Sequence, residues 1–247
     1  MEITANKYRD TYFGSATDEA LGTCDVPIQA GFNCFAFSPT FRELDYNMRA
    51  TRHNSLTFGK GYRERVLIRV SQPVLWRRIV FWTYERPFGA IPWRVAEPID
   101  TDQEYYTRRL DRKNLFGSDV QLRDIMFRGT LGIDYRQETI HNARVDKEKN
   151  RVVFDKTLNV TPNYDASTDE FGKIMEVSMW HAINKNIRYD DIEEGSSKIS
   201  NGWSAMTQRS PGNMIVVDIF TNGDKGIDLT TQIGTVQMNG TYYWHER

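Results

Sequence analysis

The sequence predicts an all-β protein, built as an antiparallel sandwich of about eight strands. Strand-forming residues recur in runs with a period of two, and regular helical stripes are missing between them. Gly, Pro and Asn separate the runs, as in proteins with many short turns. The predicted strands are Phe32–Phe37, Tyr62–Val70, Trp76–Tyr84, Asp124–Ile133, Arg151–Val160, Lys173–Trp180, Met214–Phe220 and Ile227–Trp244.

The run Tyr62–Val70 divides into two sets of alternate residues. One set is apolar except for one acid, as expected of a face in the core, and consists of Glu64, Val66, Ile68 and Val70. The other set is mostly cationic, and consists of Arg63, Arg65, Leu67 and Arg69. We expect one face in the core and one cationic face that suits a polyanion or a partner subunit.

Trp76–Tyr84 follows after a short connection and carries Arg77 and Arg78. Aromatic residues cluster here and near the end of the chain, at Phe81, Trp82, Tyr84, Phe88, Trp93, Tyr242, Tyr243 and Trp244. For both clusters we favour core and interface positions over base stacking.

One short helix is predicted in a long loop between strands. Thr101 precedes Glu104 by three residues, a capping-box pattern, and Tyr105, Tyr106 and Leu110 continue a partial apolar stripe. The last strand run contains Asn239-Gly240, a dipeptide typical of hairpin turns, so two short strands are an alternative to one.

The length of 247 residues fits a single domain over residues 1–247, with residues 1–30 as an N-terminal extension. No apolar stretch reaches the roughly 20 residues of a membrane helix, and no secretory signal is visible, so we expect no membrane contact. Cys24 and Cys34 are expected to be buried thiols, with a single bridge between them as the alternative.

Catalytic and metal-binding patterns are missing from the sequence. His53, His141, His181 and His245 have no zinc spacing, and no nucleophile elbow or phosphate loop is present. We therefore expect no catalytic residue, no metal and no cofactor, and a protein that is not an enzyme.

Charge is distributed unevenly along the chain, although the net charge is only −1. Nine basic and three acidic residues lie between Phe41 and Arg78, so this segment carries +6 and the remainder −7. An acidic run follows later, with Asp190, Asp191, Glu193 and Glu194. A solvated loop or a subunit contact is favoured there over a calcium site, because the ligand spacing of an EF-hand is missing.

Three segments of the chain resemble the capsid proteins of genomoviruses, the gemycircularvirus-like group of small circular single-stranded DNA viruses. They are Trp76–Phe81, Asn184–Asp191 followed by Glu193, Glu194 and Gly195, and Tyr242–Arg247. A weaker similarity lies at Thr51-Arg52 with Asn54-Ser55.

This resemblance implies a jelly-roll subunit that closes into a small icosahedral T=1 shell around single-stranded DNA. The implied partners are other copies of the chain and the DNA genome, in the virion and, during assembly, in the host nucleus. Candidate phosphate-binding residues, some of which could instead pair with acids at subunit contacts, are Arg49, Arg52, Arg63, Arg65, Arg69, Arg77 and Arg78. Candidate subunit-interface residues are Asp190, Asp191, Glu193, Glu194, Tyr243 and Trp244.

The sequence departs from the family pattern at its start, because no arginine-rich arm precedes Lys7-Tyr8-Arg9-Asp10. Two other functions remain open. A carbohydrate-binding sandwich module would show a flat, exposed row of Trp or Tyr on one sheet face. A β-sandwich hydrolase would hold two carboxylates in a deep cleft.

Overall fold

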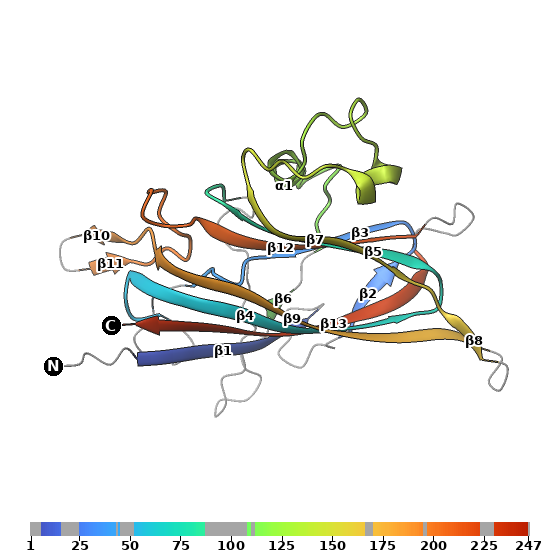
Figure 1. Cartoon of the computed structure of the whole chain (residues 1–247), viewed down its shortest axis with the longest axis horizontal. Coiled ribbons are helices and arrows are strands. Elements are labelled where there is room, and N and C mark those ends of the chain that lie inside the picture. Colours follow the sequence, from blue (N-terminus) through green and yellow to red (C-terminus); the bar gives the residue numbers. More distant parts are fainter. Residues whose placement is uncertain are drawn as a thin grey trace.

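The computed structural model describes residues 6–15, 25–42, 44, 52–86, 108–109, 112–165, 170–194, 197–222 and 230–246. Two antiparallel sheets pack face to face as the layers of a sandwich (Figure 1). The strands of the sandwich are β1 (Asn6–Ser15), β2 (Val26–Gln29), β3 (Phe32–Phe37), β4 (Leu56–Val70), β5 (Val74–Thr83), β7 (Arg151–Val160), β9 (Glu170–Arg188), β12 (Asn213–Thr221) and β13 (Gln232–Glu246). Shorter elements are β6 (Arg108–Arg109), α1 (Val120–Met126), the 3-10 helix η1 (Gln137–Asn142), β8 (Asn163–Asp165), β10 (Ile192–Glu194) and β11 (Ser197–Ile199).

The strand order is that of a jelly roll. One sheet, here called the β4 sheet, has the order β6-β1-β13-β4-β9-β8, with β2 also paired to β13. The other, the β5 sheet, has the order β3-β12-β5-β7. If β2, β3, β4, β5, β7, β9, β12 and β13 are numbered one to eight, the spatial orders become 1-8-3-6 and 2-7-4-5, the arrangement of a double Greek key. The predicted fold class is therefore confirmed.

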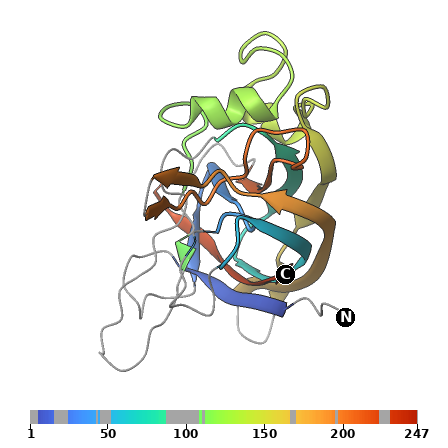
Figure 2. The same cartoon turned by 90° about the vertical axis from the view of Figure 1, so that its left-hand side faces the viewer.

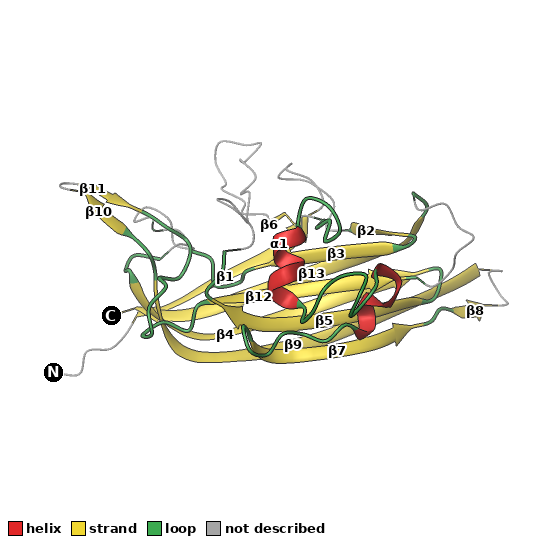
Figure 3. Ribbon diagram, turned by 90° about the horizontal axis from the view of Figure 1, so that it is seen from above, coloured by secondary structure: helices red, strands yellow, loops and turns green. Residues whose placement is uncertain are grey.

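The core lies between the two sheets and extends past the β5 sheet. Both faces of β5 are buried, because residues 112–150, here called the insertion, cover its outer side. Figures 1 and 2 show α1 over this sheet, and Figure 3 shows it from above. No described helix or strand covers the outer face of the β4 sheet (Figure 1).

Several predicted elements agree with the structure and several do not. Phe32–Phe37 and Arg151–Val160 are strands with the predicted bounds, and β4, β5, β9 and β12 are longer than predicted. The last strand, predicted over Ile227–Trp244, is described over Gln232–Glu246. Asp124–Ile133 was wrongly predicted as a strand: it contains the end of α1 followed by turns. The helix expected from Thr101 lies mostly outside the described residues, and its Arg108–Arg109 portion is the strand β6.

Residues 1–30, expected to form an extension, contribute two strands instead. β1 pairs with the second half of β13 and β2 with the first half, so the two segments lie one after the other along that strand. Asp10 of β1 also forms a buried ion pair with Arg42 at 2.9 Å. The prediction missed these strands, which the structure shows as part of the sheet.

β13 is one continuous strand and has no turn at Asn239-Gly240. Asn239 pairs with Arg65 and Gly240 with Glu64. A Cβ atom on Gly240 would lie 2.4 Å from the hydroxyl of Tyr62, so this glycine leaves room for a buried side chain.

Candidate nucleic-acid interface

The arginines predicted to bind phosphate fall into two groups in the structure. Alternate residues of β4 place Arg63, Arg65 and Arg69 on the outer face of the β4 sheet, where they are exposed. The buried group is Arg52, Arg77 and Arg78. Arg49 lies outside the described residues.

Arg78 lies between the two sheets and not on a surface. Its side chain is 2% exposed and donates two hydrogen bonds to the carboxylate of Asp218, at 2.7 and 2.6 Å, and a third to Glu64 of the opposite sheet. Burial lowers the Arg78 pKa, but the two carboxylates outweigh that effect and raise it above its ordinary value. Arg78 is thus a structural cation, and the prediction that it contacts DNA is wrong.

Glu64, the acid on the core side of β4, completes this cluster. Burial raises its pKa, against the opposing effect of the Arg78 charge. Its Oε1 accepts a hydrogen bond of 2.9 Å from the Tyr62 hydroxyl. Glu64 and Asp218 are two close carboxylates, yet both are buried against one guanidinium, which differs from the open cleft that a hydrolase requires.

Arg52 and Asp191 bind each other at one end of the sandwich. Both side chains are at most 1% exposed, and the guanidinium donates to both carboxylate oxygens of Asp191. Arg52 also lies 4.0 Å from the centre of the Tyr189 ring. Its hydrogen bonds hold the pKa of Asp191 below the ordinary value, although burial acts in the opposite direction. Neither residue is available for the DNA or subunit contact predicted for it.

Arg77 fastens the insertion to the outer face of β5. It donates to Asp155 at 2.8 and 2.9 Å and to the carbonyl oxygens of Ile140 and Ala143 at 3.0 and 2.8 Å. The guanidinium of Arg77 thus makes these hydrogen bonds within the protein. A phosphate contact at Arg77 is therefore contradicted as well.

The remaining interface candidates differ in exposure. Asp190 is half-buried and pairs with Arg86 at 2.6 Å. Glu193 and Glu194 belong to β10, whose hairpin with β11 projects from one end of the sandwich (Figure 3). Tyr243 is half-buried on the outer face of the β4 sheet, whereas Trp244 is a core residue and cannot form a subunit contact.

The outer face of the β4 sheet carries six exposed cations. We call it the basic face, and its cations are Lys7, Arg9, Lys60, Arg63, Arg65 and Arg69. Arg65 pairs with Glu176 and Arg69 with Asp25, each at 3.1 Å and each largely exposed. Ion pairs among the described residues involve none of the other four cations. Exposed pairs are weak and give way readily to competing anions.

Two aromatic rings lie within the basic face. Trp180 of β9 is 49% exposed, and its ring centre is 5.9 Å from that of Tyr243. They line an open depression of about 350 Å³ together with Lys7, Tyr8, Lys60, Arg63 and His245. The arrangement can accommodate a flat ring beside an anion.

Among the described residues, the exposed aromatic side chains do not form the row that a carbohydrate-binding module would show. Trp180 is the only exposed tryptophan in the part of the chain that the structure describes. Tyr84, the other strongly exposed ring, follows β5 in the opposite sheet.

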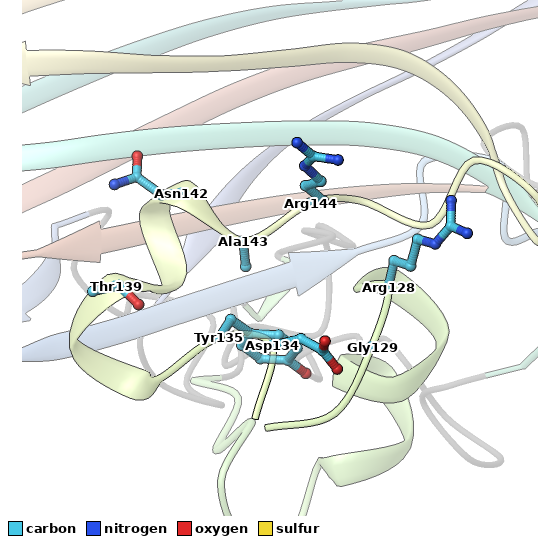
Figure 4. A pocket seen from close by; sticks show the side chains of 8 residues that line it. All are labelled: Arg128, Gly129, Asp134, Tyr135, Thr139, Asn142, Ala143 and Arg144. Atoms are coloured by element: carbon cyan, nitrogen blue, oxygen red, sulfur yellow. The ribbon is translucent and has the colours of Figure 1, made fainter. Parts of the chain in front are cut away.

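A second hollow, of about 450 Å³, lies in the insertion (Figure 4). Its lining includes Arg128, Asp134, Tyr135 and Arg144, but the two guanidinium groups extend away from Tyr135 and Asp134. Burial raises the pKa of Tyr135. These side chains do not converge on one point.

Metal and membrane features are missing from the described ranges. No group of three or more His, Cys, Asp or Glu there could hold a metal ion. No helix in those ranges is long and apolar enough to cross a membrane. Cys34 is a buried free thiol whose pKa burial raises well above its usual value, and Cys24 lies outside the described residues.

Sequence reasoning missed several residues of the basic face. Lys7 and Arg9 lie in β1, within the predicted extension, and Lys60 lies in β4 before the predicted strand Tyr62–Val70. Trp180 ends the predicted strand Lys173–Trp180, in which Ile174, Glu176, Ser178 and Trp180 all face outward. The alternation of this strand was the sequence signal that could have placed Trp180 on the outer face.

No protein-family model and no curated protein sequence matches this chain. Among solved structures, it is weakly similar to the VP1 protein of an unassembled KI polyomavirus pentamer, with 9% identity, a TM-score of 0.20, and 100% of this chain and 96% of that chain covered. The VP1 pentamer of human polyomavirus 6 gives 9% identity, a TM-score of 0.17, and coverage of 99% and 95%. VP1 of trichodysplasia spinulosa-associated polyomavirus, in complex with 3'-sialyllactose, gives 6% identity, a TM-score of 0.11, and coverage of 97% and 78%. Similarities at these values carry no inference about family or function.

Proposed function

We propose that the chain is a viral capsid protein: a single jelly-roll domain that assembles with copies of itself into a small icosahedral shell. The shell encloses circular single-stranded DNA and binds it through phosphate contacts without sequence preference. The jelly-roll topology and the resemblance of three segments to genomovirus capsid proteins support this proposal. It places the protein in the virion, with assembly in the host nucleus.

One observation carries the assignment of the DNA-binding surface: the two outer faces of the sandwich differ. The insertion covers β5, whereas no described helix or strand covers the outer face of the β4 sheet (Figure 1). That face carries six exposed cations. In a closed shell the basic face would line the lumen. Its DNA-binding residues would be Arg63, Arg65 and Arg69, joined by Lys7, Arg9 and Lys60.

Subunit contacts would use the β10–β11 hairpin. Glu193 and Glu194 lie on it, and Ile192 pairs with Ile199 across it. These isoleucines are 52% and 47% exposed, which is unfavourable in water and typical of a contact surface. The acids would pair with cations of a neighbouring subunit.

Electron microscopy combined with nuclease digestion tests the proposal. We expect the purified protein to form uniform closed particles that protect single-stranded DNA. Replacing Arg63, Arg65 and Arg69 together by Glu should reduce protection and make the salt dependence of DNA binding shallower, by about 0.7 in log–log slope per lost phosphate contact. Arg128→Glu, an exposed position in the insertion, is the matched control and should leave both unchanged.

A protein that stays monomeric at high concentration under all salt conditions would contradict the proposal. So would a triple variant that binds and protects DNA as the original chain does.

A further inference from the structure

We propose that Trp180 and Tyr243 form a base-stacking platform, which makes the basic face selective for single-stranded over double-stranded nucleic acid. This inference rests on the proposed function and specifies its ligand. It adds contacts to the bases themselves to the phosphate contacts already proposed.

The packing beneath Trp180 supports a fixed platform. Gly61 lies under the indole: a Cβ atom at this position would come within 2.2 Å of Cζ2 of Trp180. The missing side chain lets the ring lie directly on the backbone of β4, with Tyr243 tilted by 53° beside it. A ring held in place in this way loses little conformational entropy when a base stacks on it.

The charges around the platform fit a phosphate chain. Lys7, Lys60 and Arg63 line the same depression, and Lys60 Nζ donates to Asn184 Oδ1 at 3.1 Å, which orients it. A base on Trp180 would leave its phosphates within reach of these cations. Proteins that bind single strands combine the same two features, a positive groove and stacking aromatic rings.

Two other occupants of the platform fit less well. The bases of a duplex already stack on each other, so stacking on Trp180 would first require unpairing. A second copy of the chain, docked by the same face in a symmetric dimer, would bring Lys7, Lys60 and Arg63 against like charges. A single strand satisfies both the rings and the cations.

Binding measurements on the full chain test the platform with three probes of equal length: oligothymidylate, an abasic strand and a duplex. The variant is Trp180→Ala, with Trp180→Phe to preserve stacking. Ile174→Ala is the control, because Ile174 is 68% exposed on the same face of β9. Fluorescence anisotropy gives the affinities over a range of salt concentrations.

We expect the Trp180→Ala variant to bind oligothymidylate about 5-fold to 150-fold more weakly, as stacking energies of about 1–3 kcal/mol per base require. Its salt slope and its affinity for the abasic strand should not change. Trp180→Phe should retain most of the affinity and Ile174→Ala all of it. Oligothymidylate should bind the original chain more tightly than the duplex.

Three results would overturn the platform while leaving the capsid proposal standing. The first is salt-dependent binding of single strands that Trp180→Ala does not weaken. The second is a Trp180→Ala variant that binds abasic and thymidylate strands equally more weakly. The third is a Trp180→Ala variant that no longer forms particles without DNA, since the ring would then serve a structural or subunit contact. Failure of the original chain to bind DNA or to form particles would instead refute the proposed function.

Discussion

His181 illustrates how burial sets the chemistry of a single side chain. Its imidazole lies in the core, stacked on Tyr62 with ring centres 6.3 Å apart. Burial and the nearby charge of Arg78 lower its pKa from 6.5 to about 4, against an opposing effect of Asp218. The imidazole is therefore neutral near physiological pH and acts as a packing group.

We expect His181 to make the folded protein less stable as the pH falls from about 6.5 to about 4. In that window the unfolded chain takes up a proton that the folded chain refuses, and the full shift corresponds to about 3 kcal/mol. Urea unfolding at neutral pH and at about pH 4 should show this loss in the original chain and a smaller loss in His181→Phe, which keeps a stacked ring. The raised pKa of Glu64 has the opposite effect on stability as the pH falls, but it is common to the original chain and to His181→Phe. An equal pH dependence of the unfolding free energy in the original chain and in His181→Phe would contradict the assignment of this effect to His181.

The insertion shows how an element obtains stability from its contacts. α1 has only seven residues, too few for a stable isolated helix, and it buries Leu122 and Met126. Sequence reasoning predicted a strand here because short apolar runs such as Ile125 to Phe127 fit both structures. The position of this segment over the β5 sheet decided between them, and Arg77 of β5 supplies polar links to the insertion.

Replacing Arg77 by Ala should loosen the insertion. The carbonyl oxygen of Ala143 would lose its donor from Arg77, at a cost of about 1–3 kcal/mol, and that of Ile140 would keep only the Ala143 N–H. The substitution should increase the rate of hydrogen exchange more in residues 112–150 than in the β4 sheet. Arg128→Ala, which removes an exposed ion pair in the same insertion, is the control and should have little effect. Uniform exchange changes throughout the protein would argue against a local role.

Over the whole molecule, a buried polar cluster joins the two sheets of the sandwich. Arg78 of β5 binds Asp218 of β12 and Glu64 of β4, and Trp76 donates to Asp218 at 2.7 Å. Directional contacts of this kind fix how one sheet lies on the other, which an apolar core specifies less strictly. For a subunit proposed to tile a shell, that alignment determines whether its edges meet their neighbours.

Asp218→Ala should destabilise the protein by about 3–5 kcal/mol, because it leaves the buried Arg78 charge with one carboxylate and Trp76 without its acceptor. The free energy of unfolding in urea measures this loss. Arg65→Ala breaks the exposed pair with Glu176 and should cost at most about 1 kcal/mol. Similar losses for both variants would show that the cluster is not the main polar link between the sheets.

The sequence alone determined the features that depend on neighbouring residues. Alternation in β4 correctly predicted that Glu64 faces the core and that Arg63, Arg65 and Arg69 face outward. The β content, most strands and the antiparallel sandwich follow from the same local periodicity, whereas the jelly-roll arrangement was implied by the family resemblance. The periodicity is informative because successive side chains of a strand point to opposite faces wherever the strand lies.

Only the tertiary structure decided which arginines are free to meet a ligand. Arg52, Arg77 and Arg78 look like the exposed arginines in sequence, but each binds a carboxylate far along the chain, 139, 78 and 140 residues away. Asn239-Gly240 likewise has the composition of a turn, but both residues pair with β4 within a continuous strand, and the glycine leaves room for the Tyr62 side chain. Burial and charge pairing depend on residues that the fold brings together from distant strands, and a local pattern carries no information about them.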